Sequence, residues 1–173
     1  PSFGQGLKAF KLKNGLSVYI WEDESKSDVF GLVGVRAGSI NDPEEYTGLA
    51  HYLEHVMFKG TDKIGALNWT EEEPIYKEII AKYDQMAEEA DPAKKELTVK
   101  AGKLGLPNEY SNLMESMGAK GVNAGTYYDW TFYHSSFPAY QINKWLEISS
   151  QRFLHPVFRS FQSELENVYE EYN

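Results

Sequence analysis

The chain has 173 residues, a formal net charge of −9 and 42% hydrophobic residues, values typical of one globular domain with a buried core. The negative charge argues against nucleic acid as a partner, and the sequence has no run of about eighteen apolar residues that could span a membrane. The absence of Cys excludes disulfides and thiolate zinc sites.

The N-terminal part of the chain predicts antiparallel strands. Residues 10–22 (FKLKNGLSVYIWE) indicate a β-hairpin, because Asn14-Gly15 is a hairpin turn signal and apolar residues alternate after it. Residues 29–37 (VFGLVGVRA) predict a second strand at the centre of a sheet. A loop follows, after which Thr47 is expected to cap a helix.

That helix carries the most informative pattern in the chain, H-x-x-E-H, at residues 51–55. Residues four apart share a helix face, so His51 and His55 can present two imidazoles to one metal ion, with Glu54 beside them. A catalytic metal centre also needs a third protein ligand, with water in the fourth position. The alternative for this motif alone is an amphipathic helix with surface His and Glu side chains.

The middle of the chain is charged and helix-prone. Residues at about 66–105 predict a solvated helical hairpin with a break at Pro92, inserted into the domain and dispensable for folding.

Strands and helices alternate in the remainder of the chain. Residues 107–117 predict a short helix, 118–137 a strand, 141–153 a helix that packs on the core, and 161–172 a last helix. We therefore expect an α+β fold, in which an antiparallel sheet has helices packed on one face.

The last predicted helix holds four glutamates that could supply the third ligand. At about 100° per residue, Glu164 and Glu171 lie at the edge of an apolar stripe, whereas Glu166 and Glu170 point to solvent. The alternative is a solvated acidic helix without a ligand role.

Three blocks in one order carry a resemblance to a known family: residues 48–61 (GLAHYLEHVMFKGT), 121–126 (GVNAGT) and 164–171 (ELENVYEE). In these blocks and in its N-terminal hairpin, the chain resembles the pitrilysin-like zinc metallopeptidases, the family of insulin-degrading enzyme and the mitochondrial processing peptidases. The resemblance implies that residues 1–173 are an N-terminal peptidase domain, a fragment of a longer chain.

The resemblance also implies a role for each motif residue. His51, His55 and Glu171 are expected to bind Zn²⁺, with water as the fourth ligand. Glu54 is expected to act as the general base that takes the proton of this water. Glu164 is expected to lie behind the ligands and orient a His; the alternative is an exposed Glu.

A substrate site follows from the same resemblance. The strand edge at Asn123 and Ala124 is expected to bind an extended peptide by β-addition. Phe58 is expected either to line a side-chain pocket or to pack in the core. His134 and His155 match no family ligand position and are expected to be structural.

The function implied is that of a zinc-dependent endopeptidase acting on peptides or unfolded polypeptides. The alternative is a non-catalytic subunit of the same family that binds a peptide or a partner. Family enzymes close several such domains around the substrate, so we expect further domains of the parent chain or a homologous subunit, and weak or no activity from this fragment alone.

The chain departs from the family pattern in the interval between His55 and Glu171, which is longer than usual because of the charged insert. This insert is similar to that of a bacterial, envelope-associated branch of the family. The expected location is therefore the bacterial cell envelope.

Overall fold

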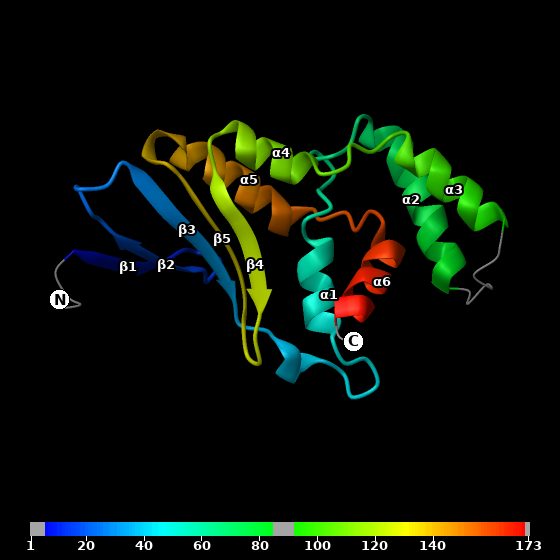
Figure 1. The fold of residues 1–173 in the computed structure, drawn as a ribbon, viewed down its shortest axis with the longest axis horizontal. Coiled ribbons are helices and arrows are strands. Elements are labelled where there is room, and N and C mark those ends of the chain that lie inside the picture. The colour runs from blue at the N-terminus through cyan, green and yellow to red at the C-terminus, as the bar shows by residue number, and fades with distance from the viewer. Residues whose placement is uncertain (1–5, 85–91, 172–173) are drawn as a thin grey trace.

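The computed structural model describes residues 6–84 and 92–171, so Tyr172 of the expected last helix and part of the insert lie outside the described residues. Among the described residues, no helix combines the length and the apolar character needed to cross a membrane. Figure 1 shows the elements, which in chain order are β1 (Leu7–Lys11), β2 (Ser17–Trp21), β3 (Asp28–Val35), η1 (Ser39–Asn41), α1 (Leu49–Val56), α2 (Trp69–Asp84), α3 (Pro92–Gly102), α4 (Glu109–Ser116), β4 (Lys120–Thr126), β5 (Thr131–Pro138), η2 (Ala139–Gln141), α5 (Ile142–Leu154) and α6 (Phe161–Glu171).

Two antiparallel sheets account for the described strands. β1 and β2 form the expected hairpin, with Gly15 in the turn at φ 90°. The second sheet has the order β3-β5-β4, so β3, which was expected at the centre, is an edge strand. The prediction was wrong because the single strand expected at residues 118–137 is a hairpin, closed by the Tyr127 N–H donating to Trp130 O at 2.8 Å. Its turn lacks the Gly or Asn that marks the first hairpin.

Helices α4 and α5 cover one face of this sheet and bury the core against it (Figure 1). Alternate side chains of β5 are buried on this face, as a strand with a helix layer on one side requires. The fold is thus the expected α+β arrangement of an antiparallel sheet with helices packed on it. The buried core consists of Ile64, Tyr110, Met114, Met117, Ala119, Phe137, Trp145 and Ile148.

The motif helix α1 lies between β4 and α6 (Figure 1). Its N-cap is Gly48, with φ 91°, and not the expected Thr47. The Asp42 carboxylate takes over the capping role, since it accepts hydrogen bonds of 2.8 Å from the backbone N–H groups of both Gly48 and Ala50. The sequence reading missed this cap because Asp42 reaches the helix across a loop.

The close approach of β3 to α5 yields a stability prediction. A Cβ on Gly31 would lie 2.5 Å from the Trp145 ring, whose indole N–H is bound to Ser135 Oγ at 2.9 Å, whereas a Cβ on Gly34 would meet nothing closer than 3.7 Å. We expect Gly31→Ala to lower the free energy of unfolding by about 1–3 kcal/mol, measured by urea denaturation. Gly34→Ala is the matched control, and equal losses in the two variants would contradict this account.

Candidate metal centre

Three side-chain donor atoms converge at the ends of α1 and α6. The Nε2 atoms of His51 and His55 lie 3.1 Å apart, one turn from each other on α1. Glu171 Oε2, in the last turn of α6, lies 3.5 Å from His51 Nε2 and 3.6 Å from His55 Nε2. The structure therefore brings together the two His of the motif and the Glu selected from the last helix.

The spacing of these atoms fits a zinc ion. A tetrahedral zinc with N and O ligands at about 2.0–2.2 Å separates its ligand atoms by about 3.4 Å, close to the three distances observed. Two imidazoles and one carboxylate are also a donor set of catalytic zinc sites. Both His side chains are partly buried, whereas the Glu171 side chain is 54% exposed, so the group lies at the surface and not in the core.

The Glu54 side chain points from α1 toward the sheet and is largely buried, since the residue is only 8% exposed. Thr126, at the end of β4, donates its hydroxyl hydrogen to Glu54 Oε2 at 2.8 Å. The sequence analysis assigned no role to Thr126, although this residue ends the block at residues 121–126 (GVNAGT). β4 thus holds the carboxylate that neighbours the two His.

Glu164 lies behind His55 and is also only 8% exposed. Its Oε2 is 3.5 Å from His55 Nδ1, and its Oε1 forms an ion pair of 2.5 Å with Lys59 Nζ. The exposed-Glu alternative therefore does not hold for Glu164. Glu166 and Glu170, which the helical wheel directed to solvent, are exposed.

The residues expected to contact substrate lie in two environments. Asn123 is exposed and Ala124 half-buried on β4, which pairs with β5 on one side and is an edge of its sheet. Phe58 is half-buried and packs against the core, with its ring centroid 5.7 Å from that of Tyr110 and 6.0 Å from that of Tyr133.

A buried cation behind Phe58 was not anticipated from the sequence. The Arg152 guanidinium lies over the rings of Phe58, Tyr110 and Tyr133, with its central carbon 3.9–4.6 Å from the ring centroids. Burial lowers the pKa of Arg152, and the nearby Glu54 charge opposes this shift. Burial also raises the pKa of Tyr133 to about 12. No periodicity signal marks Arg152, because a charged residue at the end of a helix is ordinarily solvated.

Part of the sequence matches a known family. The model of the Insulinase family, Peptidase family M16, matches residues 18–73. The insulin-degrading enzyme homolog of Dictyostelium discoideum is 35% identical over 80 residues, which are 46% of this chain and 7% of that protein. Protease 3 of Escherichia coli K12 is 41% identical over 56 residues, which are 32% of this chain and 6% of that protein.

Solved structures show the same fold. A protease from Helicobacter pylori superimposes with a TM-score of 0.68 at 22% identity, over 95% of this chain and 30% of that one. The first half of the periplasmic protease PqqL from Escherichia coli gives 0.65 at 22% identity, over 97% and 29%. The fold is thus that of pitrilysin-like domains. The resemblance seen in the motifs is confirmed, because part of the chain matches the model of the insulinase, or M16, peptidase family and relatives named for that family.

The contact between Thr126 and Glu54 leads to a prediction. Thr126→Val removes the hydroxyl that donates to a buried carboxylate but keeps the shape and strand preference of the side chain. We expect a loss of about 1–3 kcal/mol in the free energy of unfolding of the metal-free chain, measured by urea denaturation. Thr126→Ser, which keeps the hydroxyl, should lose less. If the two variants unfold alike, the hydroxyl does not support Glu54.

Proposed function

We propose that the chain is the metal-binding domain of a zinc-dependent endopeptidase. The observation that carries the proposal is the convergence of the His51, His55 and Glu171 donor atoms at distances suited to zinc. The peptidase part is supported by family M16 and by relatives named as proteases. A relative from Schizosaccharomyces pombe bears the name "Putative zinc protease mug138", which supports the choice of metal.

His51, His55 and Glu171 would hold the ion, and their charges suit it. Two neutral imidazoles and one carboxylate leave a net positive centre, which favours attack on a carbonyl group. When bound, zinc supplies a Lewis acid that makes water acidic enough to serve as a nucleophile near neutral pH.

Glu54 is assigned as the general base. The Thr126 hydroxyl donates a hydrogen bond to Glu54 Oε2, so Oε1 is the oxygen assigned to accept the proton of the attacking water. The same oxygen would then pass this proton to the leaving amine. The same bond restricts the rotation of the carboxylate, so Thr126 orients the base relative to the two His of α1.

Glu164 is assigned to the orientation of His55. Its carboxylate lies on the Nδ1 side of the ring, which favours the tautomer with hydrogen on Nδ1 and a lone pair on Nε2, the atom that faces Glu171. Lys59 neutralises the second oxygen of Glu164, so the buried carboxylate does not stand as an isolated charge.

Substrate would add to the free edge of β4 at Asn123 and Ala124. Backbone hydrogen bonds of this kind are indifferent to side chains, which suits peptides or unfolded polypeptides of varied sequence. Phe58 is assigned to the core and not to a substrate pocket, because its ring packs against the core cluster and carries the Arg152 guanidinium.

The complete cleft would need more than this domain. The chain spans only 6–7% of the relatives above and 29–30% of the two solved structures. We therefore propose that further domains of the parent chain, or a homologous subunit, close over the site. One fold neighbour is a periplasmic protease of Escherichia coli, which supports the cell envelope as the location.

The ligand assignment can be tested with two neighbouring glutamates. Glu171→Gln is expected to weaken zinc binding by more than the roughly 10–100-fold that loss of an outer partner causes, because it removes a charged ligand. Glu170→Gln is the matched control, since it removes an exposed carboxylate one position away. Zinc affinity is measured by competition with a chromophoric chelator. Loss of zinc in the Glu170 variant with retention in the Glu171 variant would reverse the assignment.

The role of Glu54 can be separated from metal binding. Glu54→Gln is expected to retain zinc but to turn over peptides about 10²–10⁴-fold more slowly, because the amide cannot accept the proton. Turnover is measured on a mixed peptide library with the complete gene product. Near-normal turnover by the variant would exclude Glu54 as base. Absence of turnover by the zinc-loaded wild type would favour the non-catalytic alternative.

A further inference from the structure

The insert is not a solvated hairpin, because α2 has a face that packs onto the domain. Glu72, Tyr76, Ile79 and Tyr83 fall within about 60° of one another on the helical wheel. Glu72 is 1% exposed and Ile79 is buried. A buried carboxylate such as that of Glu72 is unfavourable unless the surface that it faces supplies a counter-charge or hydrogen-bond donors.

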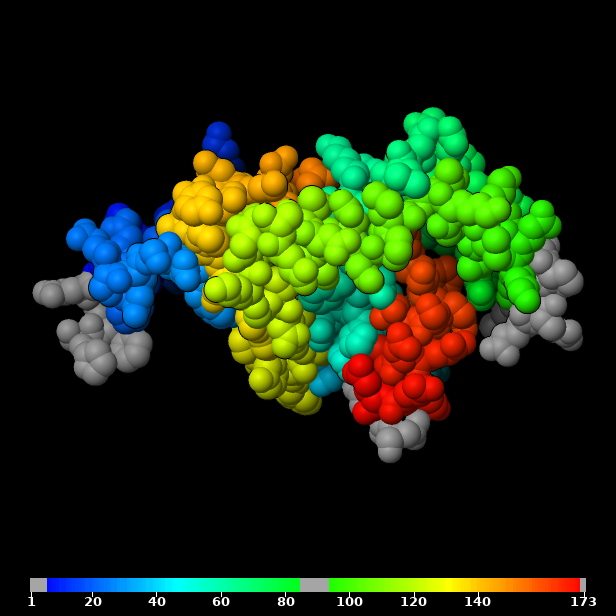
Figure 2. Space-filling model, turned by 45° about the horizontal axis from the view of Figure 1, so that its top comes forward, coloured from blue at the N-terminus to red at the C-terminus, as the bar shows by residue number. Residues whose placement is uncertain are grey.

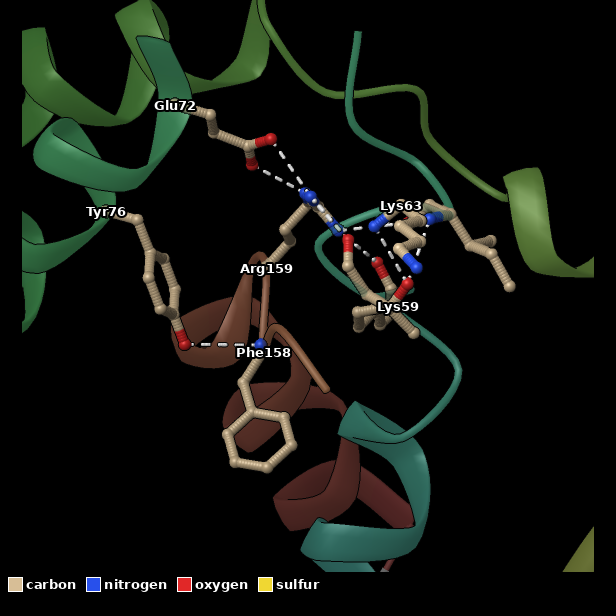
Figure 3. Close-up of polar contacts among 8 residues, drawn as sticks. Lys59, Lys63, Glu72, Tyr76, Phe158 and Arg159 are labelled. Atoms are coloured by element: carbon tan, nitrogen blue, oxygen red, sulfur yellow. Dashed lines mark hydrogen bonds and ion pairs between the residues drawn. The ribbon is translucent and has the colours of Figure 1, made fainter. Parts of the chain in front are cut away.

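The α2 face contacts the turn that leads into α6. Tyr76 Oη accepts a hydrogen bond of 3.2 Å from the Phe158 N–H, as Figure 3 shows. About two turns further along the same face, the Tyr83 ring packs edge-on against Phe161, the first residue of α6, with 4.9 Å between centroids. The insert therefore touches both ends of the connection into α6.

Arg159, between these two contacts, is the partner of Glu72. Its guanidinium donates to both Glu72 oxygens, from Nε at 2.5 Å and from Nη2 at 2.9 Å. It also donates to the backbone oxygens of Thr61 at 2.9 Å and of Lys59 and Ile64 at 3.3 Å (Figure 3). One side chain thus joins α2, the loop after α1 and the segment that starts α6.

The start of α6 depends on these contacts. Ser160 has φ 56°, a left-handed conformation that a non-glycine residue keeps only where its surroundings hold it, and its carbonyl oxygen accepts the first α6 bond from the Glu164 N–H. On the other side, the Tyr52 hydroxyl of α1 donates to Phe161 O at 2.8 Å. Figure 2 shows α6 between α1 and the α2–α3 hairpin.

The position of Glu171, at the C-terminal end of α6, depends on the orientation of α6 at its N-terminal end, which we call its base. Glu171 stands about 15 Å along the helix from Phe161, so a tilt of about 10° at the base would move it by about 3 Å. Metal–ligand distances tolerate only about 0.2 Å. Because the Glu171 side chain is 54% exposed, its own packing does not hold it in place.

We propose that α2 of the insert is a positioning element of the metal centre, with Glu72 and Tyr76 as positioning residues that hold the base of α6 and thereby place Glu171. This inference rests on the zinc site proposed above. It replaces the expectation that the insert is dispensable.

Two variants and one control test the proposal. Tyr76→Phe removes only the hydroxyl that accepts from Phe158, and Glu72→Gln removes the charge that faces Arg159. Glu73→Gln is the control, because Glu73 is the adjacent residue of α2 and pairs on the surface with Lys77.

The first readout is amide hydrogen exchange of the metal-free chain. We expect exchange in α6 to rise about 5-fold in Tyr76→Phe, the factor that corresponds to one hydrogen bond, and further in Glu72→Gln, with β5 unchanged. The second readout is zinc affinity, expected to fall on the order of 10-fold in both variants. Glu73→Gln should match the wild type in both measurements.

Each outcome decides the proposal. The proposal would be overturned if amide hydrogen exchange in α6 matched that of the control. It would also be overturned if exchange rose equally in α6 and β5, since the contacts would then serve only overall stability. Unchanged zinc affinity despite faster α6 exchange would also overturn it. If Glu72→Gln does not fold, Tyr76→Phe decides. If the wild type binds no zinc, the proposed function fails, whereas the exchange measurement still tests whether α2 holds α6.

Discussion

The attachment of α2 to the start of α6 depends on how the charge of one largely buried cation, Arg159, is satisfied. Arg159 directs its five N–H donors at two carboxylate oxygens and three carbonyl oxygens that come from separate parts of the chain. If Arg159 or Glu72 lost its partner, an unpaired charge would remain largely buried, at a cost of several kcal/mol. This cost favours one arrangement of α2, the loop after α1 and the segment that starts α6. The ion pair, together with buried apolar residues of α2, thus joins the insert to the domain, which explains how so polar a segment is anchored.

The site itself has two supports that act on different residues. β4 holds Glu54 through Thr126, whereas α6 brings Glu171 to the two His and Glu164 to His55. Both supports act on α1, from opposite sides. A disturbance of the sheet would therefore affect the candidate base first, and a disturbance of α6 would affect the metal ligands first. This separation permits proton transfer and metal binding to be examined independently in variants.

The parts that the sequence predicted are those specified by local periodicity. The spacing of His51 and His55 and the hairpin at Gly15 follow from helical geometry and turn chemistry, and the structure has both in the expected place. The preference for Glu171 over Glu170 follows from the helical wheel, and the structure brings Glu171 close to the two His. The parts that it missed depend on contacts between distant segments: the Asp42 cap, the edge position of β3, and the burial of Arg152. A helical wheel assigns a charged residue to solvent, and only the fold reveals a ring stack or a counter-charge that makes burial favourable.

A long insertion separates the second His from the third ligand, and by our proposal its contacts keep it from loosening the site. Loop closure over a longer connection costs little, so an insert can persist whatever it does. An insert whose ends alone met the domain would leave the base of α6 supported only from the side of α1. Here Glu72, Tyr76 and Tyr83 recur on one face of α2 and meet three nearly successive residues of the segment that starts α6. The added chain therefore contacts the segment that starts the helix carrying the third ligand, and by our proposal it helps to position that helix.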